Sequence, residues 1–467
     1  MRSIRTNLAL LSLALPISFS SVPALAQNQP ANQPSRATPL QSRSESRALV
    51  QKLLREGKVM RPSQARRGMR GYALSVFQGT KIERFNIEVL GTLERVQGGG
   101  DLVMIRVLDG PVIQRNSGII QGMSGSPVYI NGKLLGAIAI GFGFPKEPIG
   151  GVTPITQMIE TGLPDNSARP KPVALAKKTD VESYRAKTPI VVANRQIERV
   201  LVSRDAQKPH FPDANSMTMR PCTRLVLLSG VSPSSLGRWK KIFEPYGVTP
   251  MIGGGAMSAG ARQAFGIPSK KTGVKADLSP GAAIGVQLAS GDIDATGVGT
   301  VSFRDGNRVL GFGHPMFNLG AVSMPMTTAY VHDIFPSYEI SFKLASPIDV
   351  VGELQRDNNF SVGGTVGRTA QTIPLRIRIT DADKKIDRRI NVRLIKDPLF
   401  TPELLQGIAV EAVQSTLGLD SAKTVKVSLG IGLGNGPDIR RQNTTYAGGP
   451  VILGALSELL DAVSITQ

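Results

Sequence analysis

The sequence predicts a mainly β protein. It is 41% hydrophobic but only 5% aromatic, and its 50 glycines suit many short strands joined by tight turns. Two dipeptides mark such turns. Asn131–Gly132, within PVYINGKLLGAIAIGF, favours the positive φ angles of a primed hairpin turn, and Asp305–Gly306 marks a second hairpin. A chain of 467 residues has room for about two to four domains.

The N-terminus has the features of an export signal. Arg2 and Arg5 precede an apolar run over residues 8–19, and the string ALA that ends at Ala26 is the small-x-small pattern read by signal peptidase. The run is too short to span a bilayer, so we expect residues 1–26 to be a cleaved signal peptide. No later stretch is long and apolar enough for a transmembrane segment. The predicted location is therefore the periplasm or the exterior of the cell.

Shifts in composition divide the mature chain into segments. Residues 27–45 are polar, lack periodic apolar residues and are predicted to form a disordered leader. Two strand-rich segments, 46–163 and 271–375, are separated by a linker and a small α/β insertion over 164–270. Residues 376–467 are predicted to be a β-rich accessory domain with one helix.

Three helices are expected among the strands. The apolar spacing of RALVQKLLREG predicts a helix that Gly57 ends, and SSLGRWKKIFEPYG has the pattern of an amphipathic helix. A third helix should begin where Thr401 caps the backbone and Pro402 occupies the first helical position, since a missing N–H costs nothing there.

The chain is strongly basic. Its formal net charge is +20, and losing Arg2 and Arg5 with the signal leaves +18. This charge favours anionic partners such as components of the cell envelope. Nucleic acid is not an expected partner, because the protein is predicted to be exported and its basic residues are not interleaved with aromatic ones. The sequence does not predict an oligomeric state.

No cofactor or metal is expected. Cys222 is the one cysteine of the sequence, so an intrachain disulfide is excluded. We interpret Cys222 as a small buried apolar residue beside LVLL, with a nucleophilic or redox thiol as the alternative. The histidines lack the HExxH spacing of a zinc site.

The string GMSGSP over residues 122–127 is the most informative motif for chemistry. A serine between glycines on a tight turn can present its hydroxyl while neighbouring N–H groups point one way. The string has the shape of the GDSGGP turn of chymotrypsin-class enzymes, and that alignment selects Ser124 rather than Ser126 as the nucleophile. The N–H groups of Gly122 and Ser124 would form the oxyanion hole.

A serine nucleophile needs a base, and the sequence contains three histidines. His314 follows an apolar strand that ends in glycines, in VLGFGHP, which fixes its direction as a general base requires. His210, in the polar loop KPHFPDAN, is interpreted as a surface residue. His332, in AYVHDIF, is interpreted as a structural residue at a strand end. A hydrogen-bonded packing role is the alternative for His314.

A family resemblance joins the two motifs. GIIQGMSGSPVYINGKLLGAIA resembles the Ser-containing segment of the SpoIVB-type serine peptidases, and IGVQLASGDIDATGVGTVSFRDGNRVLGFGHP resembles their His-containing segment. Together these matches cover roughly residues 66–160 and 278–370. The resemblance implies a trypsin-like double β-barrel core and a serine endopeptidase, with Ser124 as nucleophile and His314 as base. It also places Asp109 as the third member, which orients the imidazole.

The order of the segments departs from the family. In SpoIVB-type peptidases the His segment comes first, whereas here Asp109 and Ser124 precede His314 and the insertion lies between them. Triads of one geometry occur in several chain orders, so a split core remains compatible with catalysis. Asp333 and Asp349 lie nearer to His314 in sequence and are rival orienting carboxylates.

Two functions follow from these observations. The first is an exported serine endopeptidase that cleaves an envelope protein or itself through an acyl-enzyme at Ser124. The second is a catalytically inactive peptidase-like scaffold that binds a cell-envelope polymer or a partner protein, for which the basic charge and the extra domains speak.

Overall fold

The computed structural model describes most of the chain after the N-terminal segment. The described residues are 39–95, 100–141, 147–164, 181–192, 194–203, 213–221, 225–253, 278–337, 341–417, 423–432 and 438–447. All of them belong to one compact unit, Ala37–Gln467. The predicted signal peptide, Cys222 and His210 lie outside the described residues.

The first sheet contains nine strands. They are β1 (Arg70–Val76), β2 (Ile82–Arg95), β3 (Asp101–Val107), β4 (Pro127–Ile130), β5 (Lys133–Gly141), β6 (Ile149–Pro154), β7 (Val181–Val192), β8 (Arg195–Ser203) and β9 (Ser216–Pro221). The hydrogen-bonded order is β1-β4-β5-β6-β3-β2-β7-β8-β9, and β1 also pairs with β2. Strands β1, β4, β5, β6, β3 and β2 therefore pair in a closed cycle.

The second sheet contains ten strands. They are β10 (Leu225–Ser229), β11 (Thr249–Ile252), β12 (Ala283–Gly291), β13 (Asp294–Asp305), β14 (Arg308–Gly311), β15 (Gly320–Phe335), β16 (Phe342–Asn358), β17 (Ser361–Val366), β18 (Thr372–Asp381) and β19 (Ile386–Ile395). Their order is β11-β10-β13-β14-β17-β16-β15-β12-β19-β18, and β13 also pairs with β12. A second cycle results, through β13, β14, β17, β16, β15 and β12. A separate hairpin joins β20 (Lys423–Ile431) to β21 (Ile439–Ala447).

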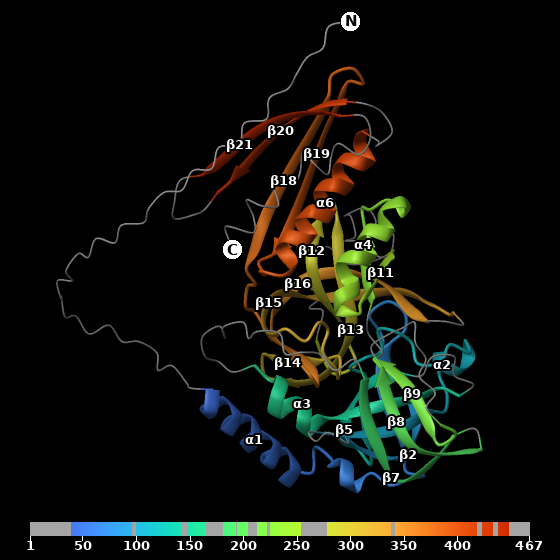
Figure 1. Cartoon of the computed structure of the whole chain (residues 1–467). Helices are drawn as coiled ribbons and strands as arrows, with labels where there is room; N and C mark the ends of the chain where they lie inside the picture. The colour runs from blue at the N-terminus through green and yellow to red at the C-terminus, as the bar shows by residue number, and fades with distance from the viewer. Residues whose placement is uncertain are drawn as a thin grey trace, which may run out of the picture. The chain divides into compact units, whose positions relative to one another are not determined.

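Helices are few and lie outside the strand cycles (Figure 1). The α-helices are α1 (Pro39–Arg55), α2 (Pro111–Gln114), α3 (Ile155–Gly162), α4 (Leu236–Phe243) and α6 (Phe400–Leu417), and the 3-10 turns are η1 (Pro62–Gln64), η2 (Pro233–Ser235) and η3 (Glu244–Tyr246). All three predicted helices are present, but the predicted cap of the third is wrong: α6 begins at Phe400, Thr401 lies within it, and the carboxylate of Asp397 accepts the N–H groups of residues 399 and 400. Helix α1 begins at Pro39, inside the segment predicted to be a leader. No described helix is long and apolar enough to cross a membrane.

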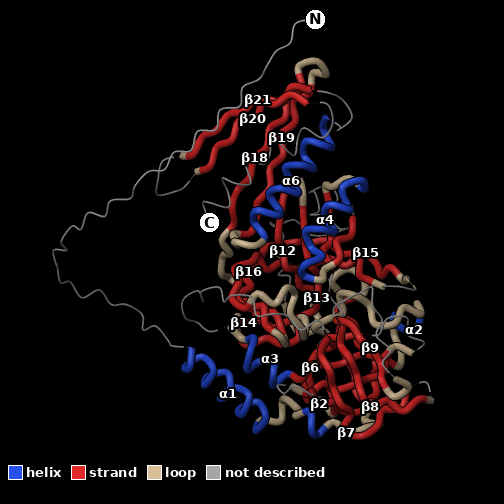
Figure 2. The backbone as a smooth tube through the Cα atoms, viewed as in Figure 1, coloured by secondary structure: helices blue, strands red, loops and turns tan. Residues whose placement is uncertain are grey.

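The prediction of a mainly β protein is confirmed, since strands make up most of the described backbone (Figure 2). The two strand cycles are compatible with a double barrel, but the trypsin-like classification stays a prediction. The first hairpin turn is also confirmed, because Asn131 and Gly132 have φ of 50° and 75° between β4 and β5. At the second hairpin Asp305 belongs to the strand, because it pairs with Arg308. The two turn residues are therefore 306 and 307, Gly and Asn, instead of the predicted Asp305–Gly306.

Helices α4 and α6 complete the core of the second sheet. Trp239 and Phe243 on α4 and Phe400 on α6 are fully buried in one apolar cluster with residues of β12, β13 and β19. The helices come close together at Gly407, where a Cβ atom would lie 2.9 Å from Ile242 and 3.1 Å from the Trp239 ring. This helix–helix contact therefore depends on a glycine.

The same substitution should have opposite effects in these two helices. Gly407→Ala forces the helices apart and should lower the free energy of unfolding by about 1–3 kcal/mol, the usual cost of overpacking. Gly237→Ala on α4, where a Cβ atom meets nothing within 4 Å, should raise it by up to about 1 kcal/mol through helix propensity. Urea denaturation measures both. A stabilising Gly407→Ala would contradict the packing described.

Candidate active site

Ser124 lies on a turn whose backbone is fixed from within. Gly122 and Gly125 have φ of 96° and 94°, a region that L side chains rarely adopt. The N–H groups of Met123, Gly125 and Ser126 donate to the carbonyls of residues 120, 138 and 123, at 3.0, 2.7 and 2.9 Å. These three N–H groups are different from the N–H groups of Gly122 and Ser124, which are predicted to form the oxyanion hole. The turn therefore has one defined shape.

Strand β13 of the second sheet lies directly against this turn. The N–H of Thr300 donates to the carbonyl of Ser124 at 2.8 Å, and the Ser302 hydroxyl donates to the carbonyl of Gly125 at 2.8 Å. A Cβ atom on Gly125 would lie 1.9 Å from the Thr300 carbonyl and 2.5 Å from the N atom of Phe312. Only a glycine can occupy this position. Because it has no side chain, the Ser124 turn and strand β13 can come into backbone contact.

The loop that carries His314 meets the same turn. Phe312 and Gly313 both have positive φ, 70° and 71°, and the former is unusual for a bulky residue. A Cβ atom on Gly313 would lie 3.3 Å from the carbonyl of Ile138, which also accepts the N–H of Gly125. The residue before His314 and the residue after Ser124 thus touch one peptide group. The structure brings the two predicted motifs together.

The orientation of the His314 ring selects one tautomer. Its Nδ1 lies 2.8 Å from the carbonyl oxygen of Pro315. A carbonyl can only accept, so this hydrogen bond requires a proton on Nδ1 and makes Nε2 the basic nitrogen of the neutral ring. That is the tautomer that a general base for a serine needs. The side chain is 5% exposed, and Ser124 is fully buried.

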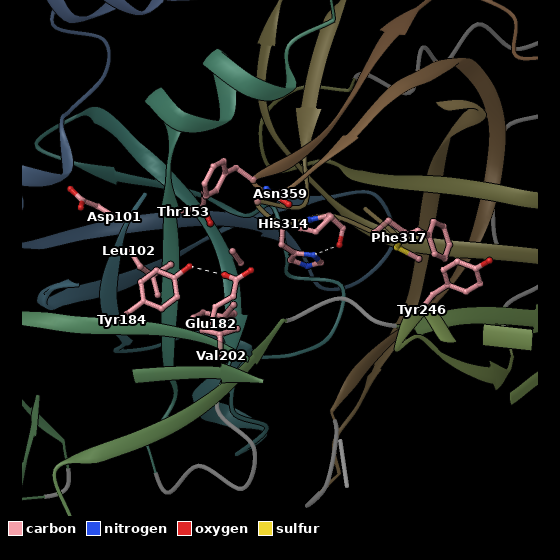
Figure 3. Close-up of a pocket in the computed structure, with 16 residues that line it drawn as sticks. Asp101, Leu102, Thr153, Glu182, Tyr184, Val202, Tyr246, His314, Phe317 and Asn359 are labelled. Atoms are coloured by element: carbon pink, nitrogen blue, oxygen red, sulfur yellow. Dashed lines mark hydrogen bonds between the residues drawn. The ribbon is translucent and has the colours of Figure 1, made fainter. Parts of the chain in front are cut away.

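A small cleft of about 50 Å³ lies beside His314. Its walls combine strands of the first sheet with the loop after β14. Figure 3 shows His314 between a hydrogen-bonded pair, Tyr184 and Glu182, on one side and Phe317 on the other. The Tyr184 hydroxyl donates to Glu182 at 3.0 Å, and Arg95 forms an ion pair with the same carboxylate at 3.1 Å. The cleft therefore combines apolar and charged side chains.

The three carboxylates predicted as the third member of the triad have other partners in the structure. Both carboxylate oxygens of Asp109 accept hydrogen bonds from Asn86, at 2.7 Å from its N–H and 2.6 Å from its side-chain amide. Asp333 is exposed and forms an ion pair with Arg115 at 2.8 Å. The N–H of Asp349, on β16, donates to the hydroxyl of Thr328 on β15 at 3.4 Å. The Nδ1 partner of His314 in the structure is the Pro315 carbonyl.

Asp357, which sequence reasoning missed, holds the loop that follows His314. Its carboxylate accepts the N–H groups of Met316, Phe317 and Leu319 at 2.7, 2.8 and 3.3 Å. The residue is 2% exposed, and burial raises the pKa of this carboxyl while the N–H donors oppose that shift. A buried carboxyl group that accepts hydrogen bonds from several nearby N–H groups holds a loop in one conformation.

Lys343 was also missed, and it lies behind the Ser124 turn. Its Nζ donates to the hydroxyl of Ser75 at 2.9 Å, and Ser126 donates to the same oxygen at 3.0 Å. The lysine is 2% exposed, and burial lowers its pKa to about 7. One weak signal was available in the sequence, a lone lysine within the strand string SFKLAS.

The histidines and acids of the described residues form no metal centre. No group of three or more His, Cys, Asp or Glu residues that could hold a metal ion occurs among them. His332 donates to or accepts from the hydroxyl of Ser346 at 2.8 Å, and burial lowers its pKa. Its contacts agree with the structural role predicted for it.

Comparison with known proteins supports the predicted resemblance. Residues 43–159 match the family model described as SpoIVB peptidase S55. The matched range includes Asp109 and Ser124 and ends before the segment of His314. No curated protein and no solved structure matched the chain. The Ser-containing part of the chain is therefore similar to the SpoIVB-type serine peptidases.

The carboxylate of Asp357 should stabilise the His314 loop measurably. Asp357→Asn should lower the free energy of unfolding by about 2 kcal/mol or more, because the asparagine NH₂ group would face backbone N–H donors and leave a buried donor unpaired, which costs about 1–3 kcal/mol. The matched substitution Asp387→Asn, at an exposed ion pair on β19, should have little effect. Urea denaturation compares the two variants, and equal stabilities would contradict the role given to Asp357.

Proposed function

We propose that this protein is an exported serine endopeptidase of the SpoIVB type, which cleaves an envelope protein or itself. Ser124 is the nucleophile and His314 is the general base. The observation that carries the proposal is the junction of the two motifs, in which β13 and the Gly313 loop contact the Ser124 turn through backbone atoms. The family match over residues 43–159 supports the same chemistry.

The reaction follows from the tautomer of His314. Nε2 takes the proton of the Ser124 hydroxyl as Oγ attacks the carbonyl carbon of the scissile peptide bond. The oxyanion that forms is stabilised by the N–H groups of Gly122 and Ser124. When the C–N bond breaks, His314 gives its proton to the leaving amine. Water then hydrolyses the acyl-enzyme by the same route in reverse order.

In this proposal the substrate enters through the cleft of Figure 3. Ser124 is fully buried and His314 nearly so, which means that the described conformation is closed. Access requires the cleft to widen while the contact between the Gly313 loop and the Ser124 turn is kept. Binding of a peptide in the cleft and opening of the site are then linked.

The third catalytic position is part of the proposal as well. The resemblance assigns it to Asp109, while the carbonyl of Pro315 orients Nδ1 in the closed conformation. Asp109 would take up an orienting role only if the opening that exposes Ser124 also moved the loop of His314. Asp109→Asn therefore separates the two possibilities, because it should slow the reaction only in the first case.

A fluorophosphonate probe should label Ser124 in the purified mature protein. Ser124→Ala removes the nucleophile and His314→Ala removes its base, so each should reduce the labelling rate at least about 100-fold, the contribution of general base catalysis. Mass spectrometry of the labelled peptide locates the adduct. His332→Ala and Ser428→Ala, which change the same residue types elsewhere, should label like the wild type.

An adduct that forms equally fast in His314→Ala would contradict the assignment of the base. A folded wild type that takes up no probe, with or without peptide in the cleft, would contradict the peptidase function itself.

A second candidate function, a scaffold that binds an anionic envelope component, is favoured by the surface of β18 and β19. Residues opposite one another in this antiparallel pair share a face, and the exposed face carries Arg376, Arg378, Arg389 and Arg393. Arg378 lies directly across from Arg389, a like-charge pair that destabilises a sheet unless an anion lies near it. Asp387 pairs with Arg378 at 2.9 Å.

Guanidinium groups bind phosphate in a bidentate manner, so phosphate-bearing lipids fit this face.

The scaffold function predicts binding to phosphatidylglycerol vesicles that weakens as salt rises. The triple variant Arg376→Gln, Arg389→Gln and Arg393→Gln should lose most of this binding in a cosedimentation assay, because it removes the arginines not paired with Asp387. Ser124→Ala should bind like the wild type.

The control removes the same charge elsewhere, through Lys58→Gln, Lys240→Gln and Lys241→Gln, which lie on exposed surface. If this control loses binding to the same extent, the net charge rather than the arginine face is responsible, and the scaffold proposal fails.

A further inference from the structure

Lys343 is held directly beside the turn that carries Ser124. Residues 341–343 of the second sheet pair with Gln121, whose N–H donates to Ser341 at 2.8 Å and whose carbonyl accepts the N–H of Lys343 at 3.0 Å. The aliphatic stem of the lysine then covers Gly122, where a Cβ atom would lie 3.1–3.3 Å from its methylene carbons. The side chain therefore fills the space behind the predicted oxyanion hole.

The amine of Lys343 begins a chain of hydrogen bonds that returns to the turn. Nζ donates to Ser75 at 2.9 Å, and the hydroxyls of Ser75 and Thr300 are 3.5 Å apart. Thr300 donates to the carbonyl of Gly122 at 2.9 Å. Ser126 joins the chain by donating to Ser75 at 3.0 Å. The chain contacts the turn on both sides of Ser124 and fixes the peptide plane between Gly122 and Met123.

Among the described residues, no charged group compensates the amine. The shift of its pKa has burial as its one cause, so no carboxylate among the described residues contributes. The centre of the Phe77 ring, in the residue after β1, lies 5.7 Å from Nζ. On β15, the neighbouring strand, His332 is hydrogen-bonded to Ser346 and Asp333 is ion-paired with Arg115. A protonated amine would thus be an unpaired charge in a dry site, which is costly.

We propose that Lys343 is a positioning residue for the Ser124 turn, and that its amine, acting through Ser75 and Thr300, holds Gly122 in the geometry required for reaction at Ser124. This inference rests on the proposed peptidase function. Protonation of Nζ favours a loosened turn in which the charge reaches water. The reactive geometry therefore requires two neutral bases, His314 to accept the proton and Lys343 to hold the turn.

The sign of the effect on stability follows from the lowered pKa. Between about pH 7 and the ordinary pKa of lysine, the folded state carries a neutral amine and the unfolded state a charged one, so stability rises with pH across this window. Lys343→Met, which keeps the length of the side chain and removes the amine, should abolish this contribution. The variant is expected to be folded, and more stable than the wild type below pH 7.

The test is the pH dependence of fluorophosphonate labelling at Ser124. Below neutral pH, the logarithm of the wild-type rate should rise with a slope of about two, since two groups must lose protons. Lys343→Met should show a slope of about one, and at pH 8 a rate lowered roughly tenfold by the lost hydrogen bond. Ser302→Ala, which contacts Gly125 but not the lysine chain, should keep the slope of two.

A double-mutant cycle separates positioning from packing. If Lys343 acts through Ser75, the double variant Ser75→Ala and Lys343→Met should label no more slowly than Lys343→Met alone. Losses that multiply, or a Lys343→Met profile with the slope and rate of the wild type, would overturn the proposal.

A measurement that needs no activity distinguishes this proposal from the peptidase function. In ¹⁵N-labelled protein, the Gly122 amide resonance should titrate with a midpoint near pH 7 in the wild type and stay constant in Lys343→Met. If the wild type takes up no probe but this resonance titrates as expected, the peptidase function fails and the positioning role stands. A Gly122 resonance that does not follow Lys343 overturns the positioning role.

Discussion

The site depends on one close approach between backbones. At Gly125 the Thr300 carbonyl occupies the place where a Cβ atom would be, 1.9 Å from it, and the N–H of Thr300 binds the carbonyl of Ser124. No side chain intervenes, so the geometry of the Ser124 turn is set by strand β13, and β13 in turn pairs with β14, which leads to His314. Segments far apart in the sequence are joined by main-chain atoms, whose positions are less variable than those of long side chains.

Strand β16 supports this junction from both of its ends. Lys343, at its start, lies behind the Ser124 turn, and Asp357, near its end, gathers the N–H groups that follow His314. Buried ionisable groups are expensive, and a fold built for stability alone would replace them with apolar residues. Lys343 and Asp357 lie at the two halves of the candidate site, and Phe312, beside His314, has a strained φ. These energetically costly features therefore occur at the residues whose geometry the reaction requires.

Local patterns in the sequence predicted the local features well. The Asn131–Gly132 turn, the helix ended near Gly57 and the glycine-flanked turn of Ser124 each depend on backbone conformations that a few residues determine. The partners of the site could not be predicted in this way. Ser75, Thr300 and Lys343 belong to three strands, and only the register between the strands places their side chains together. Proximity along the chain also misled, because Asp333, close to His314 in sequence, is bound to Arg115.

If Ser124 and His314 form one reactive site, a peptidyl chloromethyl ketone should modify both residues. Such a reagent forms a hemiketal with a serine and alkylates the neighbouring histidine with loss of chloride, so it reacts only where both residues converge. Peptide mapping of the mature protein, treated with a small panel of these reagents, should find the alkyl group on His314 in the wild type and not in Ser124→Ala. An unmodified His314, or equal modification in both proteins, would show that the two residues do not form one site.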